Sequence, residues 1–248
     1  MIDPLESFEV HNIFSMELFG MDISMTNSSL YMILTTILIC VLMFLGTRDR
    51  GIIPNKLQSI IEKLFFFVGD IVKDNLGKES MRLFPYMFSL FMFIMFGNMI
   101  GLFPYAFSFT SQIVITIGMA SIVFVASIII GFYNQGLKYF RHFCPKEIPV
   151  YIAPFFAIIE LMSFLFRPIS LGIRLFANMV SGHIMIKVIA GFAVSLAGMS
   201  LYSYCAIIPI VFNTLLNVFK LIVCMLQAYV FVILSCVYIA ESLNVDHD

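Results

Sequence analysis

Five long apolar runs dominate the sequence and limit its fold to one class. They cover about residues 31–46, 84–104, 112–134, 151–192 and 202–240. With its flanking residues, each run can cross a bilayer, because a transmembrane helix needs about 20 predominantly apolar residues. Hydrophobic residues make up 61% of the 248-residue chain and charged residues 12%, which excludes a soluble globule. We therefore expect an all-α polytopic membrane protein with about five crossings.

The charges in the loops predict how the chain crosses the membrane. Residues 1–28 hold five acids and no Lys or Arg, whereas the following loops hold ten basic residues and form no nucleic-acid patch. These are Arg48, Arg50, Lys56, Lys63, Lys73, Lys78, Arg82, Lys138, Arg141 and Lys146. Basic loops stay on the inner side of a membrane. We therefore expect the N-terminus outside and the C-terminus inside.

The first basic loop also has a helical pattern of apolar residues. They are Leu57, Ile60, Ile61, Leu64, Phe65, Val68, Ile71 and Val72. Charged side chains lie off this stripe, which is typical of an amphipathic helix. The pattern predicts a helix lying in the membrane interface, with a satellite helix packed on the bundle as the alternative.

Two sets of small residues indicate packing rather than chemistry. Asn98 lies between Gly97 and Gly101, whose spacing allows helices to approach closely. The five cysteines are odd in number and lack the spacing of a disulfide framework or a metal site, so we interpret them as small core residues. They are Cys40, Cys144, Cys205, Cys224 and Cys236. We expect no metal and no cofactor.

The last two apolar runs are too long for simple crossings. Residues 151–192 would form a helix on the order of 60 Å long, about twice the hydrocarbon thickness. Each of these helices must therefore be tilted, kinked or partly outside the lipid core. Pro168 and Pro209 are the candidate kinks.

Arg174 lies within the first long run and is the most costly residue to place there. A charge at bilayer depth costs at least about 2.5–3.5 kcal/mol on insertion scales. Guanidinium keeps its proton, so Arg174 can hold or repel a partner's charge but cannot relay a proton. Snorkelling or internal pairing is the alternative. Glu160 shares this helix face at roughly 21 Å, where its carboxyl could exchange protons or simply be solvated.

Further polar residues suggest that the two long helices face each other. Asn178 follows Arg174 by one turn, and His183 lies half a turn around the helix, about 13 Å toward the outer end. An imidazole can relay a proton, although a lone helix histidine is more often a packing residue. A stripe on the last helix comprises Asn213, Asn217, Lys220, Cys224 and Gln227. Where the two faces meet, we expect a wet path or a hydrogen-bonded seam.

These positions predict a proton path that is interrupted by a fixed charge. His183 and Lys220 would lie near the outer end and Glu160 near the inner end, with Arg174 between them. Because like charges repel, a proton cannot pass Arg174 directly. A partner carboxyl would be ionised at Arg174 and protonated before it moved into lipid. Proton flow would then move the partner.

Several stretches of the chain carry motifs of a known family. They are RPISLGIRLFANMVSGH with KVIAGF, LQAYVFVILSCVYI, PLESFEV, MTNSSLYM and FGNMIGLFPYAFSFTS. Together they cover most of the chain, and they closely resemble subunit a of the F-type ATP synthase, the membrane stator that faces the rotating c-ring. The resemblance implies a proton-conducting subunit without a catalytic site of its own. Its implied partners are the c-ring, other Fo stator subunits including the peripheral stalk, and membrane lipid.

The resemblance also implies a role for each matching residue. Arg174 matches the essential arginine opposite the c-ring carboxylate, and Gln227 matches the glutamine next to it. Asn178 and His183 match residues beside the outer half-channel, and Glu160 matches an acid on the inner half-channel.

Lys220 departs from the family pattern, because mitochondrial relatives usually carry a glutamate at this position. An acid on another subunit or an ordered water chain would then complete the outer relay. His183 resembles the mitochondrial and alphaproteobacterial branch. The abundance of Phe, Ile and Met is typical of an AT-rich gene and favours a mitochondrial inner membrane, with an alphaproteobacterial plasma membrane as the alternative.

Three other classes of function can be considered from the residues alone. A secondary transporter could bind an anionic substrate at Arg174, although we find no inverted repeat. A haem-carrying subunit would need paired axial histidines, and the one histidine within the predicted spans is too few. A purely structural scaffold would stay active after the charges of Arg174 and Glu160 were removed. We expect one integral membrane domain with an outer segment (1–28), peripheral helices and a hairpin (29–150), and a proton-translocating long-helix hairpin (151–248).

Overall fold

The structure is a computed structural model, and it describes residues 11–14, 17–18, 21–22, 24–48, 54–103, 106–136, 153–198 and 203–243. Within these ranges, five helices are long and apolar enough to cross a membrane. They are α1 (Asn27–Arg48), α3 (Ser80–Gly101), α4 (Ile113–Gln135), α5 (Ala153–Ala197) and α6 (Ile207–Leu243). The expected all-α membrane fold with five crossings is therefore confirmed. Of the residues discussed above, Arg50, Lys138, Arg141, Cys144 and Lys146 lie outside the described ranges.

Short strands precede α1, and the sequence does not predict them. β1 (Asn12–Phe14) pairs antiparallel with β4 (Met25–Thr26). Between them, β2 (Glu17–Leu18) pairs with β3 (Met21–Asp22). Strands of two or three residues are too short to show the alternating pattern by which a strand is recognised.

Local sequence sets the ends of several helices. At the start of α1, the Thr26 backbone N–H donates to Ser29 Oγ at 3.0 Å, and the Ser29 N–H donates back to Thr26 Oγ1 at 3.4 Å. This reciprocal capping satisfies two N–H groups that the helix leaves unpaired. Gly77 and Gly136 end α2 (Lys56–Leu76) and α4 with φ values of 53° and 59°, a region that favours glycine.

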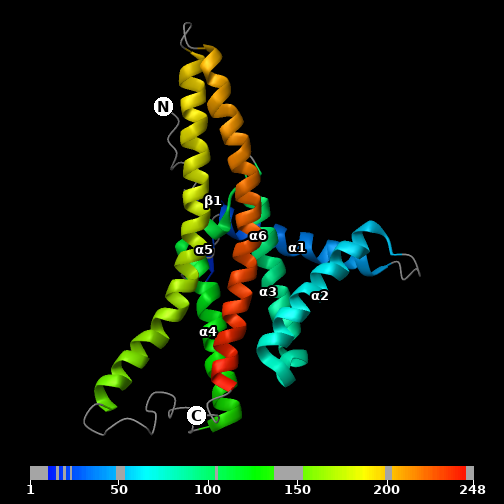
Figure 1. The fold of residues 1–248 in the computed structure, drawn as a ribbon, viewed down its shortest axis with the longest axis vertical. Helices are drawn as coiled ribbons and strands as arrows, with labels where there is room; N and C mark the ends of the chain where they lie inside the picture. The colour runs from blue at the N-terminus through cyan, green and yellow to red at the C-terminus, as the bar shows by residue number, and fades with distance from the viewer. Residues whose placement is uncertain are drawn as a thin grey trace.

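The two long helices, α5 and α6, form an antiparallel hairpin (Figure 1). Figure 1 shows α5 bending in its N-terminal half, so that its first turns lead away from α6. Pro168 lies inside this half, where proline removes an intrahelical hydrogen bond. Pro209 does not produce a kink, and that expectation is wrong. It is the third residue of α6, in a first turn whose N–H groups have no intrahelical partner.

One apolar core joins α2 (Lys56–Leu76) to α3, α4, α5 and α6. Its fully buried members include Val68, Met92, Val123, Leu175 and Phe231, one from each helix. α1 lies at the edge of this core beside α2 and α3, and most of its apolar side chains are exposed (Figure 1). An exposed apolar surface of this kind suits contact with lipid or with another subunit.

α2 is the amphipathic helix that the sequence predicts, and its apolar stripe divides into two parts. Ile61 and Val68 are buried, and α2 packs against α3 and α6. Leu57 and Ile60 remain 39% and 60% exposed. The helix therefore packs on the bundle with one edge of its stripe and leaves the other edge for an interface.

The interpretation of the cysteines as core residues is wrong for two of them. Cys224 and Cys236 are buried, whereas Cys40 and Cys205 are exposed. An apolar neighbourhood identifies a core only in a soluble protein, because a membrane helix is apolar on its lipid-facing side as well.

Gly97 and Gly101 of α3 lie against the segment that follows this helix. A Cβ atom on Gly97 would overlap the Phe109 ring, and one on Gly101 would come within 2.7 Å of Ser108 Oγ. Asn98 between them is fully buried. In the described part of the chain, neither polar atom of its amide has a hydrogen-bond partner. The close approach is thus to the α3–α4 connection, and the packing role stays a prediction.

Candidate functional site

Arg174 lies on the outward side of α5. It is exposed, whereas Leu171 and Leu175 on the inward side of the same turn are 1% and 0% exposed. Within the described ranges, no hydrogen bond or ion pair holds its guanidinium, although it interacts electrostatically with Tyr238 of α6. Ile173 beside it is 43% exposed. The charge is therefore presented, on an apolar surface, to whatever lies against this face.

Asn178 and Gln227 join the two long helices one turn beyond Arg174. The Asn178 Nδ2 atom donates a hydrogen bond of 2.7 Å to Gln227 Oε1. Gln227 is only 4% exposed. Next to this bond, Cys224 Sγ lies 3.9 Å from Met179 Sδ. The polar stripe of α6 thus faces α5 at these positions and forms a seam between the helices.

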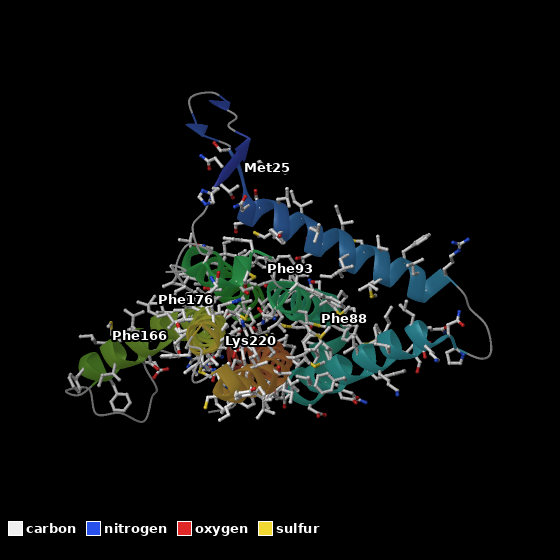
Figure 2. All side chains as sticks on the ribbon, turned by 90° about the horizontal axis from the view of Figure 1, so that it is seen from above. Met25, Phe88, Phe93, Phe166, Phe176 and Lys220 are labelled. Carbon is white, nitrogen blue, oxygen red and sulfur yellow. The ribbon has the colours of Figure 1, made fainter. Side chains whose placement is uncertain are left out.

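Lys220 continues this seam toward the tip of the hairpin. It is 7% exposed, and Figure 2 shows it among the helices near the centre of the bundle. Its stem lies on Gly182 of α5, since a Cβ atom there would come within 2.8 Å of Lys220 Cε. His183 is half-buried beside it and interacts electrostatically with both Lys220 and Lys187. Basic groups therefore gather here on both helices.

Farther toward the tip of the hairpin, Asn217 bonds within its own helix, whereas the buried Asn213 Oδ1 atom has no hydrogen-bond partner among the described residues. The Asn217 side chain is exposed, and its Nδ2 atom donates to the Asn213 backbone oxygen at 3.0 Å. Sequence analysis places both residues on the facing side of α6. Of this stripe, Lys220, Cys224 and Gln227 are the members that are buried.

Glu160 lies at the other end of the site. It is half-buried on the part of α5 that leads away from α6, about four turns before Arg174. The structure therefore keeps Glu160 and Arg174 apart, as their spacing predicts, and brings Asn178 to Gln227.

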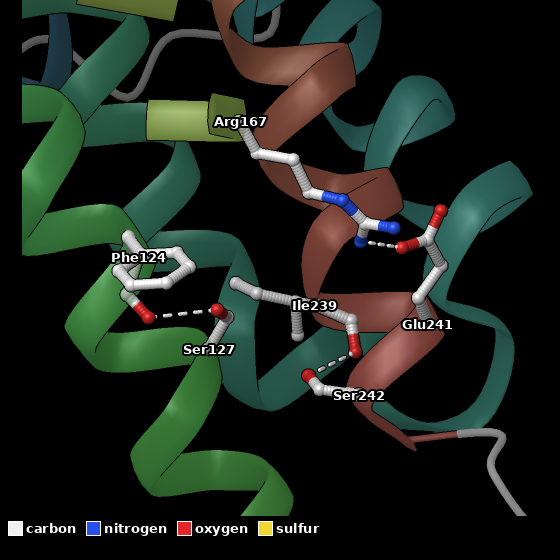
Figure 3. Close-up of polar contacts among 6 residues, drawn as sticks. All are labelled: Phe124, Ser127, Arg167, Ile239, Glu241 and Ser242. Atoms are coloured by element: carbon white, nitrogen blue, oxygen red, sulfur yellow. Dashed lines mark hydrogen bonds and ion pairs between the residues drawn. The ribbon is translucent and has the colours of Figure 1, made fainter. Parts of the chain in front are cut away.

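Arg167 and Glu241 are polar residues of this site that sequence analysis missed. They form an ion pair between α5 and α6 (Figure 3). The Arg167 guanidinium also lies over two aromatic rings, 5.8 Å from the Phe164 centroid and 5.6 Å from the Tyr238 centroid. A signal was available, because residues 160, 167 and 174 are seven apart and share one helix face. The partner at position 241 had no comparable signal.

Comparisons with known proteins agree along the whole chain. The sequence model of the family described as ATP synthase A chain matches residues 29–240. A protein of Afipia carboxidovorans named ATP synthase subunit a is 44% identical over 249 residues, which cover 100% of both chains. Proteins of the same name from Parvibaculum lavamentivorans and Rhodospirillum rubrum are 42% and 43% identical. These matches cover 99% and 98% of this chain and 95% and 99% of the relatives.

Proposed function

The chain belongs to the ATP synthase A chain family, and we propose that Arg174 is the fixed charge at which its proton path meets the carboxylates of a c-ring. The protein is a proton-conducting stator subunit in the membrane part of ATP synthase. The exposed position of Arg174 on α5 carries the proposal. A permanent charge on an apolar surface needs a partner of opposite charge, and a carboxylate on a neighbouring subunit meets that need.

Two offset half-channels would lead to and from this charge. Asn178, His183 and Gln227 would border the outer one, because the α5–α6 seam here holds polar groups that can bind water. Glu160 would border the inner one, about four turns away along α5. Because the two paths end on opposite sides of Arg174, a proton would cross only by riding on the moving ring.

Arg174 would act by electrostatics alone. A c-ring carboxylate that approaches it is stabilised in the ionised form, so its proton leaves toward Glu160. A carboxylate that moves on into lipid must first take up a proton from the outer side. The membrane potential supplies about 2.3 kcal/mol per charge per 100 mV, which gives the cycle its direction. The chain would have no catalytic site of its own.

Partners and location follow from the family. Association with the c-ring and other Fo subunits is implied by membership, and contacts with the peripheral stalk and lipid are part of the proposal. The relatives named above come from alphaproteobacteria. They favour the plasma membrane of such a bacterium and give no support to the mitochondrial inner membrane expected from the sequence. We further propose an outer N-terminus and an inner C-terminus, as the basic loops predict.

The proposal is tested by ATP-driven proton pumping in inverted membrane vesicles. Arg174→Ala should assemble into the complex in normal amount and pump no protons. Arg48→Ala is the matched control, because Arg48 is an exposed arginine at the end of α1, away from the hairpin. It should pump like the wild type. An Arg174→Ala complex that pumps at the wild-type rate would show that the charge is only structural and would contradict the proposal.

A further inference from the structure

Three charged residues stand at equal intervals along one face of α5. Glu160, Arg167 and Arg174 are seven residues apart, so successive charges are separated by about 10 Å along the helix. Arg167 therefore lies between the acid of the proposed inner path and the arginine that would meet the c-ring. A second unpaired cation at this place would repel an outgoing proton and compete with Arg174 for a carboxylate.

The structure shows how this second charge is balanced. The Arg167 guanidinium forms an ion pair with Glu241, which lies in the last turn of α6. The Arg167 side chain is 19% exposed and the Glu241 side chain 39% exposed, so the pair is partly shielded from solvent. Figure 3 shows the guanidinium directed across to α6. The guanidinium also lies 5.8 Å from the Phe164 ring centroid and 5.6 Å from the Tyr238 ring centroid, two rings that the figure does not draw.

Tyr238 places this pair close to the centre of the site. Its hydroxyl interacts electrostatically with Arg167, Arg174 and Glu241. Tyr238 thus lies within electrostatic range of both arginines. Of the two, only Arg167 has an ion-pair partner within the described residues. Arg174 is exposed and Arg167 is paired, although both lie on one face of α5.

We propose that Glu241 is a positioning residue that neutralises Arg167, so that Arg174 remains the single uncompensated positive charge on this face. This inference rests on the proposed stator function. It adds the condition that the inner proton path holds no unpaired cation between Glu160 and Arg174. Glu241 holds Arg167 against α6 and away from the line between Glu160 and Arg174. Protons that leave the ring then pass a neutral pair instead of a second cation.

A simple clamp between α5 and α6 is the competing explanation, and the two differ in a double substitution. Replacing Arg167 by methionine and Glu241 by glutamine removes both charges and also the hydrogen bond across the gap, because a thioether donates no hydrogen bond and accepts only weakly. Charge compensation predicts that the double variant works, whereas a clamp predicts that it fails like either single variant. A non-additive rescue of this kind is what a double-mutant cycle detects.

The experiment measures passive proton conduction through Fo in membranes stripped of F1, together with ATP-driven pumping by the whole complex. Glu241→Gln leaves Arg167 unpaired and should lower conduction about tenfold. Arg167→Met leaves a partly exposed acid, which water can solvate, and should have a milder effect. The double variant that combines Arg167→Met with Glu241→Gln should conduct within about threefold of the wild type. Glu62→Gln is the matched control, because Glu62 is an exposed acid on α2.

Each alternative result has a definite meaning once the amount of the chain in the purified complex is shown to be normal. Loss of conduction in Glu241→Gln without rescue by Arg167→Met would make the pair a clamp and overturn the proposal. Normal conduction by Glu241→Gln would overturn it as well. If that variant conducts normally while Arg174→Ala is inactive, only this inference fails and the stator function stands.

Discussion

Asn178 on α5 and Gln227 on α6 hold the middle of the long hairpin together through a hydrogen bond of 2.7 Å. Asn178 lies one helical turn after Arg174, so this bond sets the rotation of α5 beside the exposed arginine. Gln227 has no solvent to replace a lost partner, because it is only 4% exposed. The seam therefore determines which way Arg174 faces.

Loss of the Asn178 amide should loosen the hairpin. Asn178→Ala removes the donor to Gln227 and leaves a buried amide unsatisfied, at a cost of about 1–3 kcal/mol. We expect the detergent-solubilised complex to lose this subunit at a lower temperature than the wild type and to pump more slowly. Ser181→Ala is the control, since Ser181 is exposed and its hydroxyl contacts only its own helix at Asn178 O. Equal behaviour of the two variants would show that the seam does not hold the hairpin.

Much of this site could be predicted because polar residues are conspicuous in an apolar chain. Arg174, Asn178 and Gln227 stand out from runs of Leu, Ile and Phe, and their helical spacing predicts which faces meet. The five membrane helices follow from the same contrast. Their observed ends lie within a few residues of the predicted ones, as for α4 (Ile113–Gln135 against 112–134).

The remaining features depend on contacts that sequence spacing does not show. Arg167 and Glu241 pair across 74 residues, and nothing in the local sequence joins them. The exposure of Cys40 could not be predicted, because hydropathy does not distinguish the lipid-facing side of an apolar helix from its packed side. The short β1 and β4 strands depend on a register formed by two or three residues, which is too little for a pattern.

Gly172 is expected to be the position in α5 where even a methyl group disturbs the fold. A Cβ atom there would come within 2.9 Å of the Ile117 Cα atom and 3.1 Å of its nitrogen, both in the backbone of α4. Because a backbone cannot turn aside as a side chain can, Gly172→Ala should push α4 from α5 and cost about 1–3 kcal/mol. Thermal denaturation of the solubilised complex measures the effect.

Gly191→Ala provides the control for this substitution. Gly191 lies in the same helix, and nothing lies within 4 Å of the place its Cβ atom would take. Alanine forms helix better than glycine by about 1 kcal/mol, so this variant should be as stable as the wild type or more stable. If Gly172→Ala matches Gly191→Ala, the two helices are not packed as closely as the structure indicates.

Lys220 stands where the sequence resemblance leads us to expect a glutamate, and its surroundings predict that an acid would be accepted in its place. His183 and Lys187 both lie within electrostatic range of this position. Lys220→Glu would replace a repulsion between basic groups with an attraction, while its shorter side chain still fits beside Gly182. We expect normal assembly and ATP-driven proton pumping at or above the wild-type rate in inverted vesicles.

Lys220→Met separates the charge of this residue from its packing. Methionine keeps an unbranched chain of similar length against Gly182 but carries no charge and exchanges no proton. If water or another subunit completes the outer path, Lys220→Met should also assemble and pump. Loss of pumping in both variants, with assembly intact, would mean that the amine itself carries protons. The outer relay would then run from Lys220 to His183 within this chain, and no acid from another subunit would be required.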